Sequence, residues 1–274
     1  MRLTASALVL ALLAALPAAA QIAPRAVVSV DLLDGWREPD GSRLAALEIV
    51  LAPGWHTYWR VPGAAGIPPR FDWSGSANLA SVAYEWPRPA VFERFGLRSF
   101  GFADRLVLPL RLRPRDASAP VDHALAVDFG VCDDICMPAS AELAGRIAPD
   151  TPEEGRARIE AALADRPRSA GEAGVAAVAC GLAPAANGYE LTARVTFAAD
   201  PAPGQLAVIE PGQPDLWIGE AESDTEGRTL TARAPVEAAG AGGPVLERRS
   251  LRLTLLDADR AVDLRGCQGG RDLR

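Results

Sequence analysis

Cysteine is the residue type in this sequence with the clearest capacity for chemistry. Cys132 and Cys136 stand four positions apart within Gly130–Pro138, whereas Cys180 and Cys267 lie far from each other in the chain. Four cysteines allow three disulfide pairings. The spacing favours Cys132–Cys136 together with Cys180–Cys267.

The short spacing of the first pair constrains the chain around it. Four residues of extended chain would hold the two Cα atoms roughly 13 Å apart, but a disulfide needs about 4.4–6.8 Å. The chain must therefore turn, and Asp133 and Asp134 are suitable turn residues. Because nearby carboxylates disfavour a thiolate, the reduced pair would react slowly until a partner protein changes its surroundings. The equal alternative is that both aspartates are simply solvated turn residues.

Loop length separates the two pairs in their expected roles. Closing the long loop between Cys180 and Cys267 removes about 4.6 kcal/mol of unfolded-state freedom, and closing the short loop between Cys132 and Cys136 removes only about 2 kcal/mol. We therefore expect the long bridge to be structural and the short one to be redox-active. A structural clip across a hairpin is the alternative for the short pair, because C-x3-C alone is a weak motif.

Cu(I) binding is the main competing function for the same cysteines. Two thiols and the adjacent Met137 are soft ligands of the kind that Cu(I) prefers. His56 and His123 are the only histidines. We expect His123 to be a core histidine, whereas a ligand role and a packing role are equally open for His56. Zinc-type C-x2-C pairs, phosphate loops, dinucleotide fingerprints and hydrolase motifs are absent from the sequence. We therefore expect no cofactor and assign no metal site.

Residues 1–20 have the pattern of a secretory signal peptide. Arg2 precedes an apolar run from Ala5 to Leu16, and Ala18–Ala20 forms a small-residue cleavage site. The run is short for a membrane span of about 20 residues, so we expect an exported, soluble chain without a membrane span after cleavage. Export permits disulfides, and the net charge of −7 argues against a nucleic-acid partner.

The residues after the signal peptide have the pattern of β-strands. Residues 43–51 are mostly apolar, and alternation with a period of two runs through 106–112 and through 125–131. This period indicates strands with one buried face. Pro109 lies inside the second of these runs, so we expect it on an edge strand or at a bulge.

A helix is expected between two β-rich regions. Thr151 followed by Pro152 and Glu153 is a helix start, and the helix is predicted over 151–166. Alternation resumes at 191–197 and again at 251–255.

The fold class that follows is mainly β, with two immunoglobulin-like β-sandwich modules joined by a short helix. We expect the first module over 22–150, a helical linker over 151–171 and the second module over 172–274.

Several runs in the first module together resemble a known family. They are Pro53–Trp59, Gly66–Pro69, Phe95–Gly96, Asp104–Leu110 and Val131–Pro138. The combination looks like the amino-terminal domain of the thiol:disulfide interchange protein DsbD family, and it is closer to the ScsB-like variant.

The resemblance implies a domain that accepts electrons from a membrane-embedded thiol donor and reduces periplasmic thioredoxin-like proteins. In that family the second cysteine of the pair attacks the partner's disulfide and the first one resolves the intermediate, which maps onto Cys136 and Cys132. The family also has a cap loop whose aromatic side chain shields the pair, and Phe95 matches that loop.

We therefore expect a periplasmic protein that relays electrons by thiol–disulfide exchange, as one component of a protein-disulfide reductase if it is an enzyme at all. DsbD itself spaces its cysteines more widely, and this sequence contains neither a membrane domain nor a carboxy-terminal thioredoxin domain, so we expect it to borrow an electron donor. Copper tolerance through the same cysteines is the alternative. A third class is an interaction module whose pair is inactive.

Overall fold

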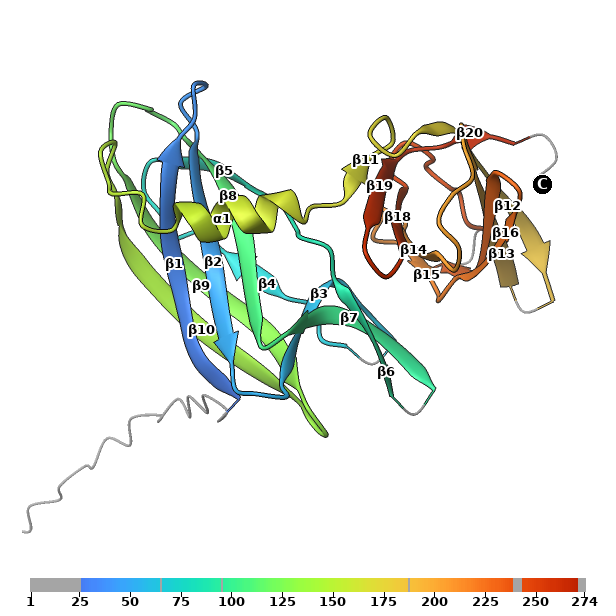
Figure 1. The fold of residues 1–274 in the computed structure, drawn as a ribbon, viewed down its shortest axis with the longest axis horizontal. Helices are drawn as coiled ribbons and strands as arrows, with labels where there is room; N and C mark the ends of the chain where they lie inside the picture. The colour runs from blue at the N-terminus through green and yellow to red at the C-terminus, as the bar shows by residue number, and fades with distance from the viewer. Residues whose placement is uncertain (1–25, 65, 95, 187, 239–242, 271–274) are drawn as a thin grey trace, which may run out of the picture.

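The fold is described from a computed structural model, over residues 26–64, 66–94, 96–186, 188–238 and 243–270. Within these residues it consists of strands and one helix, arranged as two β-sandwich modules joined by that helix (Figure 1). The prediction of a mainly β fold with two immunoglobulin-like modules is confirmed. No helix among the described residues is long and apolar enough to cross a membrane.

The first module contains two sheets that pack face to face. One sheet has the order β1-β2-β8-β5, and the other has the order β10-β9-β3-β7-β6 with β4 added beside β9. The strands are β1 (Val27–Arg37), β2 (Arg43–Leu51), β3 (His56–Gly63), β4 (Arg70–Asp72), β5 (Leu79–Tyr84), β6 (Ala90–Arg94), β7 (Leu97–Ala103), β8 (Arg105–Pro114), β9 (Val121–Cys132) and β10 (Cys136–Ile147).

Alternating side chains of the two sheets form the core of the first module. Leu108 and Leu110 of β8 are fully buried, and Val127, Phe129 and Val131 of β9 are at most 2% exposed. The strands expected from the period-two pattern are therefore present, with the expected face inward.

Pro109 does not lie at an edge or a bulge, contrary to the expectation. It is inside β8, which pairs with β2 on one side and with β5 on the other, and it lies opposite Ala46. Its carbonyl accepts a hydrogen bond from the backbone N–H of Glu85, one residue beyond the end of β5. The backbone N and C=O of a strand residue point toward the same neighbouring strand. The nitrogen of Pro109, which carries no hydrogen, therefore points to the place where β5 ends, and the lack of a donor is tolerated there.

Helix α1 (Arg156–Ala164) lies across the outer face of the β1-β2-β8-β5 sheet (Figure 1). Ile159 is fully buried and packs with Leu33, Leu44 and Ala46. The helix begins later than the sequence suggested, because the hydroxyl of Thr151 accepts the backbone N–H of Ala148 and so closes a turn that precedes the helix.

The second module also contains two sheets. Their orders are β11-β19-β18-β14 and β15-β17-β13-β12-β20, with β16 beside β17. The strands are β11 (Arg168–Ser169), β12 (Val175–Ala185), β13 (Gly188–Phe197), β14 (Leu206–Glu210), β15 (Leu216–Ile218), β16 (Glu222–Glu226), β17 (Thr229–Ala238), β18 (Arg252–Leu256), β19 (Ala261–Arg265) and β20 (Gln268–Gly269).

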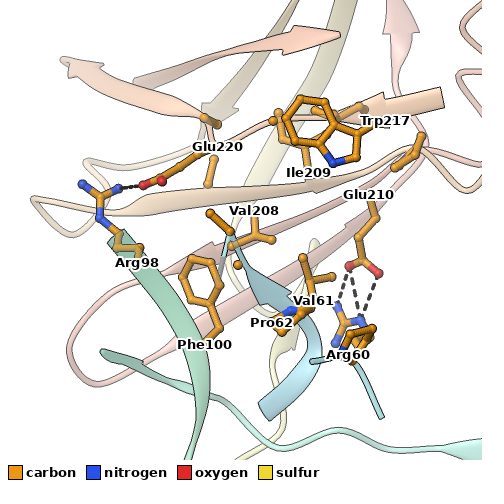
Figure 2. Close-up of a pocket in the computed structure, with 18 of the residues that line it drawn as sticks. Arg60, Val61, Pro62, Arg98, Phe100, Val208, Ile209, Glu210, Trp217 and Glu220 are labelled. Carbon is orange, nitrogen blue, oxygen red and sulfur yellow. Dashed lines mark hydrogen bonds and ion pairs between the residues drawn. The ribbon is translucent and has the colours of Figure 1, made fainter. Parts of the chain in front are cut away.

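The two modules contact each other through ion pairs and apolar side chains. Arg60 of β3 donates to both carboxylate oxygens of Glu210, and Arg98 of β7 pairs with Glu220 at 2.7 Å. These pairs border a pocket of about 600 Å³ between the modules, into which Phe100 and the exposed Trp217 project (Figure 2). The second module is therefore packed against the sheet that carries β3 and β7.

Candidate functional site

Cys132 and Cys136 face each other at the turn end of a long hairpin. Cys132 is the last residue of β9 and Cys136 the first of β10, and the pairing continues from them to Val121 and Ile147. The two cysteines are directly opposite, with 4.1 Å between their Cα atoms, and they form a disulfide. Asp133–Ile135 supply the turn that the spacing required.

The two cysteines differ in their exposure to solvent. Cys132 is only 4% exposed, whereas Cys136 is exposed, and the neighbouring Ile135 at the tip of the turn is 71% exposed. Successive residues of a strand point to opposite faces of the sheet. Because Val131 points into the module's core, Cys132 lies on the opposite face. Its burial therefore comes from side chains that cover this outer face.

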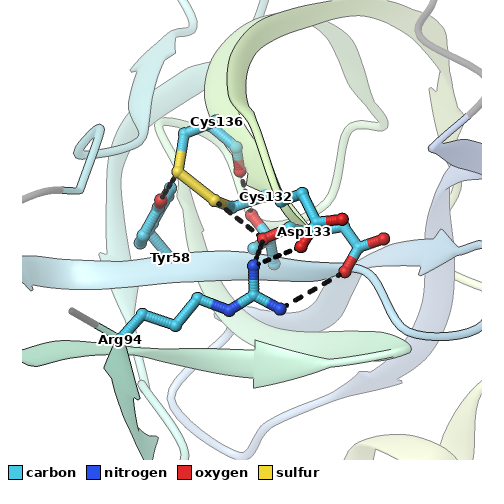
Figure 3. The surroundings of a disulfide bond; sticks show 8 residues. Tyr58, Arg94, Cys132, Asp133 and Cys136 are labelled. Carbon is cyan, nitrogen blue, oxygen red and sulfur yellow. Dashed lines mark hydrogen bonds and ion pairs between the residues drawn. A yellow bond between two sulfur atoms is a disulfide. The ribbon is translucent and has the colours of Figure 1, made fainter.

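Tyr58 is one of these covering side chains. It is 2% exposed, and its hydroxyl donates a hydrogen bond to Cys136 Sγ at 2.9 Å (Figure 3). The ring passes over Gly130, where a Cβ atom would come within 2.7 Å of Tyr58 Cδ2. Glycine at position 130 thus leaves the space that the ring needs to reach the disulfide. Burial raises the pKa of Tyr58, so the hydroxyl stays protonated and remains a donor.

His56 is the neighbour of Cys132 on the next strand, β3. It lies opposite Cys132 in the pairing of β3 with β9, and directly opposite residues project on the same face. His56 is 8% exposed, and its ring stacks on Phe92 of β6 with 4.3 Å between centroids. Burial, and then the charge of Arg94, lowers the pKa of His56, while Asp133 opposes the shift.

Arg94, at the end of β6, binds the turn between the two cysteines. Its guanidinium donates to the carbonyl of Asp133 at 2.6 Å and to the carboxylate of Asp134 at 2.7 Å (Figure 3). A second, looser ion pair joins it to the Asp133 carboxylate at 3.8 Å. The positive charge offsets two carboxylates beside the sulfurs and so moderates the effect that was expected of them.

A pocket of about 510 Å³ lies beside the disulfide. Both cysteines line it, together with His56, Tyr58, Phe92 and Arg94. It is bounded by the β6–β7 hairpin on one side and by the β9–β10 turn on the other. The pocket gives a cysteine of another protein room to approach Cys136.

Three of these pocket residues carry no signal of a site in the sequence. Packing was an expectation for His56, Tyr58 was noted only as part of the run Pro53–Trp59, and Arg94 carried no signal because it is 38 or more positions away from the cysteines. The strand order β9-β3-β7-β6 brings them together. The run Pro53–Trp59 in the resembling motif was the one hint that these positions matter.

The structure places the remaining candidate residues elsewhere. Met137 packs against the module's core, on the face opposite to Cys136. His123 is half-buried beside Gly145, near the far end of the hairpin. Among the described residues there is no group of three or more His, Cys, Asp or Glu side chains able to hold a metal. Phe95 and residues 1–20 lie outside the described residues.

Cys180 and Cys267 form the second disulfide, within the second module. Their Cα atoms are 5.8 Å apart. Cys180 is fully buried in β12, and Cys267 is half-buried between β19 and β20. The bond thus links β12 of one sheet to the segment that follows β19 of the other sheet.

Comparisons with known proteins agree with this arrangement. Residues 23–147 match the family model described as the thiol:disulfide interchange protein DsbD, N-terminal. The crystal structure of the N-terminal periplasmic domain of ScsB from Proteus mirabilis is similar in fold, with a TM-score of 0.68 and 20% sequence identity. The match covers 88% of this chain and 92% of that chain, so both modules take part in it. No curated protein matches the sequence.

Proposed function

We propose that this chain relays electrons between protein partners by thiol–disulfide exchange, because residues 23–147 match the family model of the amino-terminal domain of the thiol:disulfide interchange protein DsbD. The pair that carries them is Cys132–Cys136. The donor is a membrane-embedded thiol protein, the acceptors are thioredoxin-like proteins, and the compartment is the periplasm, reached through the signal sequence at residues 1–20. The chain would act as one component of a protein-disulfide reductase.

The difference in exposure between the two cysteines is the observation that carries this proposal. Cys136 is exposed and borders the pocket, while Cys132 is 4% exposed behind it. Exchange passes through a mixed disulfide, in which the attacking sulfur must reach a sulfur of the partner. Cys136 is therefore assigned as the attacking cysteine and Cys132 as the resolving one.

The environment of Cys136 supports the attacking role. A hydroxyl donor at 2.9 Å stabilises a thiolate more than a neutral sulfur, because hydrogen bonds to charged acceptors are the stronger ones. The guanidinium of Arg94 adds positive charge close to the turn. Both features favour the thiolate, which is the reactive form.

We propose that the chain is divided into modules as the sequence indicated. Residues 22–150 are the redox module, 151–171 the linker and 172–274 the second module, with Cys180–Cys267 as a structural disulfide. Mild reduction followed by alkylation and peptide mapping should label Cys132 and Cys136 before the other pair. Equal labelling of all four cysteines contradicts this division of roles.

Trapping experiments test the relay itself. Without the resolving thiol the mixed disulfide persists, so Cys132→Ala should accumulate a covalent complex with a thioredoxin-like protein on non-reducing electrophoresis. Cys136→Ala is the matched variant and should accumulate none. Complexes formed by Cys136→Ala would reverse the two roles, and a lack of complexes with both variants would refute the relay.

The reduction potential of the pair provides an independent measurement. A relay that supplies electrons to thioredoxin-like proteins needs a potential of about −200 to −270 mV, whereas structural disulfides fall below about −300 mV. A value in the lower range would make the Cys132–Cys136 bond a hairpin clip.

A further inference from the structure

The pocket beside the disulfide contains one titratable side chain that has no assigned partner. Its carboxylates are engaged: Asp133 and Asp134 by Arg94, and Glu93 by Arg98. Asp104 accepts the backbone N–H of Gly54, and the Tyr58 hydroxyl donates to Cys136. Among the described residues, neither ring nitrogen of His56 takes part in a hydrogen bond.

His56 is placed in line with the two cysteines. In the sheet order β10-β9-β3, Cys136 pairs with Cys132 and Cys132 pairs with His56. Directly opposite residues have their Cβ atoms about 4.5–5.5 Å apart. The imidazole thus stands next to Cys132 on the side away from Cys136, held flat by the ring of Phe92.

From this row of residues we propose that His56 is the proton acceptor for the resolving cysteine, Cys132, during thiol–disulfide exchange. The inference rests on the proposed function and adds a proton path to it. Cys132 is 4% exposed, so bulk water is a poor acceptor for its proton. A neutral imidazole in the same row is the group able to take it.

The proposed path balances both electrons and protons. The Cys136 thiolate first attacks the partner's disulfide, so that a Cys136–partner bond forms and one partner thiolate leaves. The Cys132 thiol then gives its proton to His56 and attacks Cys136 Sγ. The Cys132–Cys136 bond forms, the bond to the partner breaks, and the second partner thiolate takes the proton from the imidazolium.

The electrostatic surroundings keep His56 ready for this step. Burial and the charge of Arg94 lower its pKa from the ordinary 6.5, and Asp133 opposes them. The other ionisable groups that line the pocket are the two cysteines, the protonated Tyr58, Glu93 paired with Arg98, Asp134 paired with Arg94, and Asp104, which accepts the backbone N–H of Gly54. At neutral pH the ring is therefore unprotonated and free to accept.

A small chromophoric disulfide, dithiodipyridine, separates the two steps in one experiment. When the reduced full-length chain is mixed with it, attack by Cys136 releases one thiopyridone and resolution by Cys132 releases the second. At pH 7 a thiol of ordinary pKa is only about 3% ionised, so a base that removes its proton raises the second rate by up to roughly thirtyfold.

His56→Phe keeps a ring that can stack on Phe92 but has no acceptor. We expect the first phase to stay within about twofold of wild type and the second to slow about ten- to thirtyfold at pH 7. In wild type the rate of the second phase should stop rising with pH below pH 6.5, once His56 is unprotonated. In the variant this rate should keep rising with pH toward the ordinary thiol pKa of about 8.5. His123→Phe, the same exchange at the other histidine, should change neither phase.

Added imidazole distinguishes a role of His56 in proton transfer from a role in packing. It should restore the second phase of His56→Ala in proportion to its concentration, which a purely structural role would not allow. An unchanged second phase in His56→Phe overturns the role of His56 but leaves the relay intact. If wild type shows no second phase, so that each cysteine binds its own probe molecule, the proposed function itself fails.

Discussion

Tyr58→Phe removes one hydrogen bond to Cys136 and nothing else near the disulfide. The hydroxyl lies 2.9 Å from Cys136 Sγ, and its ring is held over Gly130, so phenylalanine should fill the same space. A hydrogen bond to a charged group contributes about 1.5–3 kcal/mol, and one between neutral groups about 0.5–1.5 kcal/mol. The thiolate of Cys136 therefore loses about 1–1.5 kcal/mol more than the neutral thiol does.

That difference should reduce the thiolate population of Cys136 at pH 7 roughly five- to tenfold, since each 1.4 kcal/mol is about a factor of ten. Iodoacetamide reacts with the thiolate, so its rate at Cys136 in a Cys132→Ala background reports the change. Tyr84→Phe is the matched control, because Tyr84 accepts a hydrogen bond from Trp73 away from the pair. An alkylation rate within about 1.5-fold of the parent, or an equal loss in the control, would refute the role of the hydroxyl.

Three further outcomes are expected. Arg94→Gln should slow attack by Cys136 at low ionic strength and much less in high salt, measured as the first thiopyridone phase, because the carboxylates of the turn lose their counter-charge. Replacing Cys180 and Cys267 together by Ser should cost about 4.6 kcal/mol in urea unfolding and leave exchange at the other pair unchanged. Burial lowers the pKa of His123 below 6.5, so the unfolded chain binds more protons there and stability falls as the pH drops through 6.5; unfolding of His123→Gln should lack this part of the decline.

The sequence predicted the parts of this protein that depend on neighbouring residues. Alternation over 125–131 located β9 and its buried face, and the C-x3-C spacing required the turn that β9 and β10 make. Both follow from local geometry, because strand period and chain length are set by the residues themselves.

The surroundings of the pair could not be predicted in the same way, because they depend on strand order. Tyr58 and His56 are more than 70 positions from the cysteines and arrive only because β3 pairs with β9. Pro109 shows the same limit. A proline in the middle of a strand suggests an edge, but whether its missing N–H matters depends on where a neighbouring strand ends.

Cys132 and Cys136 are a directly opposed pair at the turn between β9 and β10. Their position makes the folding of the module and the oxidation of the pair depend on each other. The two processes form a thermodynamic cycle, so whatever the bond adds to the stability of the fold, the fold adds to the stability of the bond. A loop this short contributes only about 2 kcal/mol, which corresponds to roughly 40 mV for two electrons. The long bridge gains about 4.6 kcal/mol, or roughly 100 mV. Loop length alone therefore predicts that folding leaves the Cys132–Cys136 bond easy to reduce and makes the Cys180–Cys267 bond harder to reduce.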